Sequence, residues 1–338
     1  MRKFCSNILT FFYQYVKSFL CIILKLYIIF KFYIIIEKSE LMQYNRIKKL
    51  KGSAGLAEQK RIAAIHDISG IGKCSLTAAI PVISAAGIET AVMPTAVLST
   101  HTGDISGFTY RDLTSDLVEF YTHWKTLGVE FDGIYSGFLG STEQVNIVCS
   151  FIDEFKKDDT VVIVDPAMAD GGRMYTTFDD EFAKEMLLLC QKADIIVPNL
   201  TEAAFLLGES YREPPYSEEY INGIMKKLLE IGPSMVVLTG VSFNENEIGC
   251  AVCCRNDDEV FYRFSEKFSG TYYGTGDLFA SALTGAYLKG KSIYESAEIA
   301  LRFTCNSIKR TFEAKTDTRL GVNFEQGIAD YIKSLGGN

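Results

Sequence analysis

The sequence predicts an α/β fold in which a mostly parallel sheet lies between layers of helices. From Arg61 onward, short runs rich in Val, Ile and Ala alternate with longer amphipathic runs. Most of the short runs are apolar without interruption, which is typical of strands buried on both faces. A regular alternation of strand and helix builds right-handed βαβ units, and such units form parallel sheets.

Six apolar runs and the stretches between them supply the elements of this sheet. The predicted strands are residues 61–68, 89–98, 133–138, 160–166, 194–199 and 234–240. The predicted helices are residues 75–86, 113–127, 143–155, 181–190, 201–207 and 218–231. Residues 249–254 and 259–264 lie close enough in sequence to form a hairpin, and three more helices complete the chain. No repeat or linker interrupts residues 61–338, so we expect one domain there.

The charge distribution excludes a nucleic-acid partner. The 338 residues have a net charge of −8, with 34 Lys and Arg against 42 Asp and Glu. Residues 1–60 contain 11 of these basic residues and 3 of the acidic ones, which leaves a net charge of −16 on residues 61–338. A domain this acidic lacks the basic face that phosphate neutralisation requires.

Residues 1–60 are predicted to be a separate N-terminal extension. Residues 8–36 are dense in Ile, Phe, Tyr and Leu, too long for a signal peptide, and no small-residue cleavage site follows them. Apolar side chains favour membrane insertion there, whereas Lys25 and Lys31 each oppose it by about 2.5–3.5 kcal/mol if central. Three interpretations stay open: a membrane anchor, a buried or mobile helix, and a gene-prediction extension with translation starting at Met42. A membrane partner is expected only if residues 8–36 are translated and inserted.

Polar residues that follow the predicted strands are candidate ligand-binding residues, because ligands of parallel sheets bind outside the carboxyl ends of the strands. The first such stretch, residues 66–75 (HDISGIGKCS), is not a phosphate loop. A Walker A loop needs Gly where Asp67 stands and Ser or Thr where Cys74 stands, and a dinucleotide fingerprint needs Gly in place of Ser75. The stretch is therefore an acid followed by a Gly-rich turn. Two interpretations stay equally open: a ligand-binding loop, and a turn that only connects a strand to a helix.

A second motif, Gly-Thr-Gly-Asp at residues 274–277, precedes a helix with an apolar face. The free amides and the dipole at a helix N-terminus attract anions, and glycines let the backbone approach a phosphate closely. Asp277 beside such an anion can accept a proton from an attacking hydroxyl. The alternative, that Asp277 is a helix cap, does not explain the two glycines around Thr275.

Two acids follow neighbouring predicted strands. Asp165 ends one strand, and Glu202 follows the next in the sequence Asn-Leu-Thr-Glu at residues 199–202. Carboxylates at this edge suit Mg²⁺ held partly through water between phosphate oxygens. The alternative is that Asn199 or Thr201 only caps the helix that follows.

The nine cysteines do not indicate a disulfide framework. Cys250, Cys253 and Cys254 resemble metal spacing, but in a strand Cys250 and Cys253 point to opposite faces. We therefore expect core cysteines of a protein in a reducing compartment, which favours a cytoplasmic location.

Together these residues resemble the ribokinase-like fold and, within it, the vitamin kinases: pyridoxal kinases and, more distantly, hydroxymethylpyrimidine kinases. The resemblance covers about residues 61–330, with the motifs in family order. It rests on residues 64–76, STHTG (99–103), SGFLGSTEQ (136–144), VDPAM (164–168), PNLTEA (198–203) and GTGD (274–277). GTGD marks the superfamily, whereas STHTG and SGFLGS are similar to pyridoxal kinase segments. The implied fold is a three-layer α/β/α sandwich with a central, mostly parallel sheet.

The resemblance implies ATP-dependent phosphorylation of the 5′-hydroxymethyl group of pyridoxal, pyridoxine or pyridoxamine, a vitamin B6 salvage step toward pyridoxal 5′-phosphate. Asp277 would be the base, and Gly274, Thr275 and Gly276 would form the anion hole for the γ-phosphoryl group. Other implied roles are Asp67, Thr102 and Gly103 for the vitamin, Asp165, Val197, Asn199, Glu202 and Thr239 for ATP, and Asp165 with Glu202 for Mg²⁺. The resemblance also implies a homodimer and suggests K⁺ as a second cation.

Two departures leave the substrate open. Pyridoxal kinases often have Ser where Asp67 stands, whereas hydroxymethylpyrimidine kinases have Asp in a similar loop. Thr239 stands where a Lys often reaches the nucleotide. The alternatives are a hydroxymethylpyrimidine kinase, another small-molecule kinase of this fold, and a non-catalytic vitamin-binding protein. Because Asp67 can pair with a protonated ring or amine, it favours pyridoxamine among the pyridine vitamins.

Overall fold

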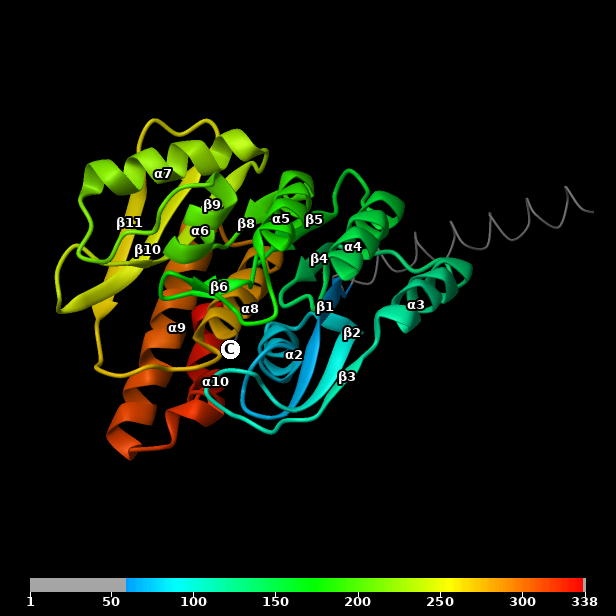
Figure 1. The fold of residues 1–338 in the computed structure, drawn as a ribbon, viewed down its shortest axis with the longest axis horizontal. Helices are drawn as coiled ribbons and strands as arrows, with labels where there is room; N and C mark the ends of the chain where they lie inside the picture. Colours follow the sequence, from blue (N-terminus) through cyan, green and yellow to red (C-terminus); the bar gives the residue numbers. More distant parts are fainter. Residues whose placement is uncertain (1–58, 337–338) are drawn as a thin grey trace, which may run out of the picture. The chain divides into compact units, whose positions relative to one another are not determined.

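The computed structural model describes residues 59–336, which form a nine-stranded sheet between two helical layers (Figure 1). The strands of this sheet are β1 (Arg61–Ile71), β2 (Glu89–Thr100), β3 (Tyr110–Asp112), β4 (Gly133–Ser136), β5 (Val161–Val164), β8 (Ile195–Ile196), β9 (Met235–Val241), β10 (Glu247–Cys254) and β11 (Phe261–Glu266). Two short strands, β6 (Ala169–Asp170) and β7 (Arg173–Met174), form a separate hairpin.

The helices alternate with the strands as the sequence predicts. They are α2 (Leu76–Ala85), α3 (Thr114–Thr126), α4 (Thr142–Phe155), α5 (Asp180–Lys192), α6 (Leu200–Leu207), α7 (Glu218–Ile231), α8 (Thr275–Leu288), α9 (Ile293–Ala314) and α10 (Ile328–Ser334). Two 3₁₀ helices, η1 (Thr318–Leu320) and η2 (Glu325–Gly327), lie between α9 and α10.

The sheet is parallel in its centre and antiparallel at its edges. Its strand order is β11-β10-β9-β8-β5-β4-β1-β2-β3. The six strands from β9 to β2 pair in parallel, whereas β10, β11 and β3 pair antiparallel to their neighbours. The predictions of a mostly parallel sheet and of a hairpin at residues 249–264 are therefore confirmed.

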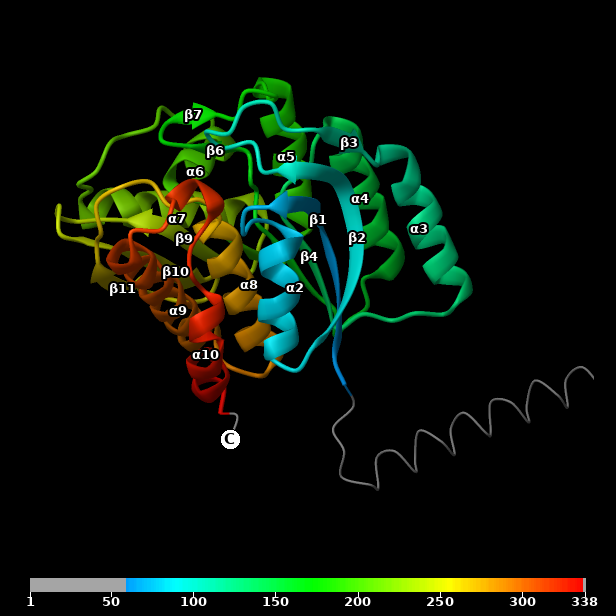
Figure 2. The same ribbon diagram turned by 90° about the horizontal axis from the view of Figure 1, so that it is seen from below.

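Each face of the sheet has its own apolar core. In β5, Val162 and Val164 pack with residues of α3 to α7, whereas Ile163 packs with residues of α2, α8, α9 and α10. This alternation follows from the two-residue period of a strand, and it requires apolar residues at successive positions. Figure 2 shows the α2, α8, α9 and α10 layer in front of the sheet. The predicted three-layer α/β/α sandwich is confirmed.

The main difference from the prediction lies in β1. This strand continues to Ile71 because Ile68, Ser69 and Ile71 pair with β2 beyond a bulge between His66 and Ile68. Asp67, predicted near the end of a strand at residues 61–68, therefore lies at the bulge, with four more strand residues after it. The strands β3, β6 and β7 were not predicted, since they contain only two or three residues each and lack an apolar run.

The cysteine prediction is confirmed for the hairpin. Cys250 packs in the core beside α8 and α9, whereas Cys253 packs in the core on the opposite face. All seven cysteines within residues 59–336 are free thiols. Two such cysteines on opposite faces cannot ligate one metal ion together.

The expectations for residues 8–36 and for a start at Met42 concern residues outside the described part of the chain. None of the helices found in residues 59–336 has the length and hydropathy that a membrane span needs.

Gly249 offers a test of the β10–β11 register. A Cβ at this position would lie 1.9 Å from the carbonyl oxygen of Arg263 on β11, so Gly249→Ala must displace the paired strand. We expect a loss of about 1–3 kcal/mol in the free energy of unfolding, measured by denaturant titration. Gly223→Ala on α7, where nothing lies within 4 Å of the added Cβ, is the control and is expected to stabilise by about 0.5–1 kcal/mol. Equal midpoints for wild type and Gly249→Ala would contradict this register.

Candidate active site

The polar residues that follow the parallel strands lie at one edge of the sheet, as predicted. The amide of Asp165 donates to the carbonyl of Ser136, at 2.9 Å, which joins the ends of β5 and β4. Asn199 and Thr239 pair as neighbours in a parallel bridge at the ends of β8 and β9. The hairpin β6–β7 and strand β3 lie at the same edge in Figure 2.

Gly274 begins helix α8 in a left-handed conformation that no other residue fits here. Its φ is +72°, and a Cβ would lie 2.2 Å from the carbonyl oxygen of Lys73. The next glycine, Gly276, has open space where a Cβ would stand. The first-turn amides of α8 have no acceptor in a preceding turn, so they and the positive end of the helix dipole can bind an anion. This geometry fits the predicted anion hole, and Gly274, not Asp277, occupies the N-cap.

Asp277, two residues into α8, has the pKa that a base needs near neutral pH. Burial raises the pKa of its carboxyl to about 7, and the negative charge of Asp67 adds to the rise. The backbone amide of Ser75 opposes the rise by hydrogen bonding to the carboxylate. A carboxyl with this pKa is half-ionised at neutral pH and can accept a proton from a bound hydroxyl.

Asp165 and Glu202 are buried carboxyls that interact with each other and, through Asp165, with Asp277. Burial is the main cause that raises the pKa of Asp165 and of Glu202, and the neighbouring negative charges raise both further. Within residues 59–336, no Lys or Arg forms an ion pair with any of the three. Uncompensated negative charge of this kind favours binding of a cation.

The two carboxyls differ in the oxygens they offer. Glu202 accepts from the amides of Asn199, at 2.8 Å, and Met168, at 3.3 Å, so both of its oxygens are occupied. The carboxylate of Asp165 accepts no hydrogen bond from the described residues. Asp165 therefore fits Mg²⁺ or its water ligands directly, whereas Glu202 fits a role through water and through its charge.

Asn199 is the N-cap of α6. Capping was the alternative to the predicted role of Asn199 in nucleotide binding. Its side-chain oxygen accepts from the amides of Thr201 and Glu202, at 2.8 and 2.9 Å, and its side-chain amide donates to Ala169. Val197 is 4% exposed and packs in the core beside α8. These two side chains thus position the edge of the sheet, whereas Thr239 is partly exposed there.

The residues proposed for the vitamin meet on the other side of the α8 N-terminus. Asp67 is buried, and burial raises its pKa while the hydroxyls of Ser75 and Ser69 oppose the rise. The loop after β2 brings Thr102 and Gly103 close to α8, because Gly103 packs against Tyr273, the residue before Gly274. These residues come from two segments, β1 and the loop after β2, and the fold brings both segments to the N-terminus of α8.

Two aromatic residues that were not predicted, His101 and Tyr273, also lie here, with ring centroids 5.2 Å apart in a stacked arrangement. Both flank predicted residues, since His101 precedes Thr102 and Tyr273 precedes Gly274. A single sequence does not reveal that two aromatic side chains 172 positions apart stack. The signal available was only their position beside the motifs.

The comparisons with known proteins agree with this geometry. The family described as phosphomethylpyrimidine kinase matches residues 72–321. The chain belongs to this family. This ribokinase-like family relates the chain to both pyridoxal kinases and hydroxymethylpyrimidine kinases.

Two solved structures are similar over most of the chain. One is a Bacteroides thetaiotaomicron protein, described as a "putative phosphomethylpyrimidine kinase" crystallised with pyridoxal, which is 37% identical with a TM-score of 0.78. The match covers 81% of this chain and 96% of that one. The other is the pyridoxal kinase of Lactobacillus plantarum, 28% identical with a TM-score of 0.75, covering 82% and 98% of the two chains.

Curated relatives include both kinds of kinase. The Bacillus subtilis hydroxymethylpyrimidine/phosphomethylpyrimidine kinase is 28% identical over 182 residues, which are 53% of this chain and 64% of that protein. The Dictyostelium discoideum pyridoxal kinase is 26% identical over 228 residues, or 63% and 68% of the two chains. An Arabidopsis thaliana bifunctional thiamine enzyme is matched over only 44% of its length. The chain thus spans about half to two thirds of these relatives.

Replacing Asp277 tests its role as the base. Asp277→Asn removes the proton acceptor, so we expect turnover, measured by ADP release, to fall about 10²–10⁴-fold with ATP affinity nearly unchanged. Because the raised pKa keeps the carboxyl protonated at acidic pH, wild-type kcat/KM should rise with pH through about 7. The residual rate of the variant should lack this rise.

Asp159→Asn, at an exposed position between α4 and β5, is the control for the loss of one negative charge. Near wild-type turnover of Asp277→Asn would exclude Asp277 as the base.

Proposed function

We propose that this chain transfers the γ-phosphoryl group of ATP to the 5′-hydroxymethyl group of pyridoxal, pyridoxine or pyridoxamine. The observation on which the proposal depends is the carboxyl of Asp277, with a pKa of about 7, in the first turn of α8, where Gly276 leaves open space beside the backbone. A base and an anion hole side by side suit transfer of a phosphoryl group to a hydroxyl.

In this mechanism the chain positions reactants and neutralises charge. Asp277 accepts the proton of the 5′-hydroxyl while the hydroxyl oxygen forms a bond to the γ-phosphorus. The bond between the γ-phosphorus and the bridging oxygen breaks, and ADP leaves with that oxygen. The amides of Thr275 and Gly276 donate to the γ-phosphoryl oxygens. In-line transfer of this kind depends on orientation more than on covalent chemistry by the protein.

ATP and Mg²⁺ belong to the same proposal. Asp165 would hold Mg²⁺ or its waters, Glu202 would act through water, and Asn199 and Thr239 would border the nucleotide. Bound Mg²⁺ supplies positive charge that neutralises phosphate oxygens. Structures of the same fold, 21% identical, support ATP: the Leishmania donovani pyridoxal kinase was crystallised with ADP and pyridoxamine, and the Staphylococcus aureus enzyme with ADP.

Three further properties remain proposals from the family resemblance: a homodimer, K⁺ as a second cation, and a cytoplasmic location. Free thiols at all seven cysteines of residues 59–336 are consistent with a reducing compartment.

A pyridine substrate is favoured by two observations. The segment STHTG packs against Tyr273 through Gly103, and the segment SGFLGS hydrogen-bonds to β1 through the amide of Gly137. The Bacteroides thetaiotaomicron protein, 37% identical, was crystallised with pyridoxal. The second candidate function is a hydroxymethylpyrimidine kinase, which Asp67 and the phosphomethylpyrimidine kinase family match favour.

A substrate panel separates these candidates. Pyridoxal, pyridoxine, pyridoxamine and hydroxymethylpyrimidine are each incubated with the full chain and Mg²⁺ATP, and ADP release is measured. We expect turnover of at least one pyridine vitamin, at a rate well above that with hydroxymethylpyrimidine. Turnover of the pyrimidine alone would replace the proposal by the second candidate, and no turnover of any compound would support a vitamin-binding protein.

Asp67 is expected to influence the choice among the vitamins. A buried carboxylate can pair with the amine of pyridoxamine, so Asp67→Ser should lower kcat/KM for pyridoxamine relative to pyridoxal by about tenfold. The ratio of the two kcat/KM values is the measurement, because it cancels any general loss of activity. An unchanged ratio would show that Asp67 does not set selectivity.

A further inference from the structure

A C-terminal segment, residues 317–325, contacts both loops proposed to bind the vitamin; we call it the C-terminal strap. Its contact with the Gly-rich turn after β1 is formed by Lys73. The amide of Lys73 donates to the carbonyl of Leu320, at 3.3 Å. The ammonium of Lys73 donates to Asn323 Oδ1, at 3.3 Å, and to Glu325 Oε2, at 2.9 Å.

Gly321 lets the strap lie directly against this turn. Its φ is +86°, and a Cβ there would lie 2.8 Å from Cβ of Lys73 and 2.9 Å from its backbone nitrogen. Only a glycine avoids both the strained conformation and the collision. Leu320 and Gly321 thus determine where the backbone of Lys73 stands, and Asn323 and Glu325 hold its ammonium.

Lys73 in turn contacts the anion hole. Its carbonyl oxygen lies so close to Gly274 that a Cβ on that glycine would stand 2.2 Å away. The position of the α8 N-terminus therefore depends on the position of Lys73, which the strap determines.

A second connection runs through His101. Its Nε2–H donates to the carbonyl of Arg319 in the strap, and its Nδ1 accepts from the amide of Gly103, at 3.0 Å. These two contacts require the neutral ring with the proton on Nε2. The ring stacks on Tyr273, which precedes Gly274. Both connections thus end at the first turn of α8.

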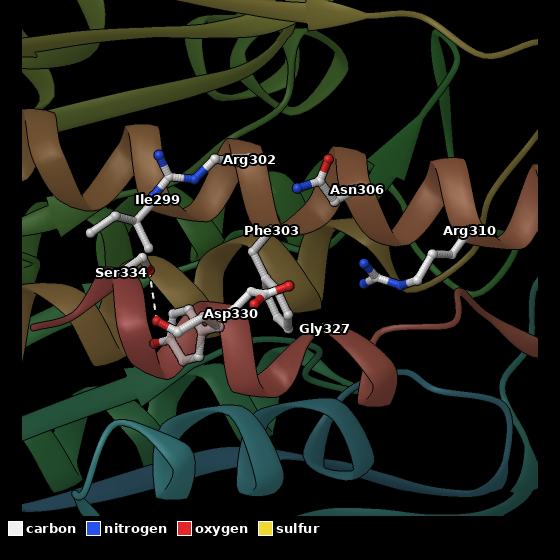
Figure 3. Close-up of a pocket in the computed structure, with 9 residues that line it drawn as sticks. Ile299, Arg302, Phe303, Asn306, Arg310, Gly327, Asp330 and Ser334 are labelled. Atoms are coloured by element: carbon white, nitrogen blue, oxygen red, sulfur yellow. Dashed lines mark hydrogen bonds between the residues drawn. The ribbon is translucent and has the colours of Figure 1, made fainter. Parts of the chain in front are cut away.

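The strap is anchored in the helical layer behind it. Val322 and Phe324 are fully or almost fully buried, at 0% and 2% exposure. The amide of Asn323 donates to Thr311 Oγ1, at 2.8 Å, and Nε of Arg310 donates to the carbonyl of Asn323, at 2.9 Å. Figure 3 shows Arg310 on α9, at one end of a pocket between α9 and α10 that none of the predicted site residues lines. In the described part of the chain, the hydrogen bonds of the strap reach the vitamin side and not Asp165, Glu202 or Thr239.

We propose that the C-terminal strap positions the vitamin loops and the anion hole through Lys73 and His101, so that its contacts set vitamin KM and kcat but not the affinity for ATP. The proposal takes the identity of the substrate from the proposed function. Lys73, Glu325 and His101 are positioning residues here.

A positioning role of the strap and a purely structural role predict effects of different size on reaction rate and on stability. The side chains of Lys73 and Glu325 are 30% and 53% exposed, and an ion pair this exposed contributes about 0–1 kcal/mol to stability. A displacement of about 1 Å at a reacting group, in contrast, can slow a reaction about 10²-fold. A positioning role therefore predicts a kinetic effect without a matching loss of stability.

The first test is Glu325→Ala, with Asp153→Ala as its matched control. Asp153 pairs with Lys192 at 2.6 Å, at similar exposures of 64% and 33%, on helices α4 and α5 away from the site. We expect Glu325→Ala to lower kcat/KM for the vitamin about tenfold with KM for ATP unchanged, and Asp153→Ala to change neither. Both variants should unfold at nearly the same denaturant concentration. Equal kinetics of the two variants, or an equal rise in KM for ATP, would overturn the proposal.

The second test uses His101. His101→Gln can still donate an amide hydrogen to Arg319, whereas His101→Asn is too short to reach it and can only accept from Gly103. We expect the Gln variant to retain more vitamin kcat/KM than the Asn variant. The reverse order would show that the link to the strap does not matter.

A third measurement does not depend on activity. Amide hydrogen exchange of residues 70–75 and 99–104 should be faster in Glu325→Ala than in wild type and in Asp153→Ala. If no vitamin is turned over, the proposed function fails while this measurement still tests the strap. Unchanged exchange would reject the strap proposal even in an active enzyme.

Discussion

The close contact between the carbonyl of Lys73 and the backbone of Gly274 is the constraint on which the site depends. It joins the turn after β1 to the N-terminus of α8, and it is possible only because Gly274 has no Cβ and adopts a positive φ. Asp67 lies six residues before Lys73, and Asp277 lies three residues after Gly274. The proposed vitamin and phosphoryl positions are therefore brought together by one backbone contact.

The electrostatics of the site follow from burying carboxyls without basic partners. Asp165, Glu202 and Asp277 each have a raised pKa because burial disfavours the charged form and neighbouring acids add to the effect. Such an arrangement destabilises the folded chain above the ordinary carboxyl pKa, since the unfolded chain ionises these groups freely. The same cluster supplies a base near neutral pH and a region that favours cations. The burial that lowers the stability of the folded chain is therefore the property that suits these carboxyls to the proposed chemistry.

Residues whose role depends on local pattern were predictable, whereas those whose role depends on distant partners were not. The apolar runs predicted the parallel strands, and the two-residue period placed Cys250 and Cys253 on opposite faces. The strand that contains Asp67 was expected to end at Ile68 but continues to Ile71, because pairing with β2 resumes beyond a bulge. For Asn199, the sequence left nucleotide contact and helix capping open, and the structure shows that its side chain caps α6 and donates to Ala169. The sequence did not predict the contacts between the C-terminal strap and Lys73 or His101, since these join residues more than 200 positions apart.

The sequence by itself determined the fold class, the alternation of strands and helices, and the family, because hydrophobic period and Gly-rich motifs are local properties. It also identified Asp277 and the glycines around Thr275 as candidate chemistry. Only the tertiary structure decided which carboxyl has a pKa near 7, which oxygens are already hydrogen-bonded, and which segments hold the anion hole in place. These properties depend on burial and on contacts between distant segments, and neither is defined until the chain has folded.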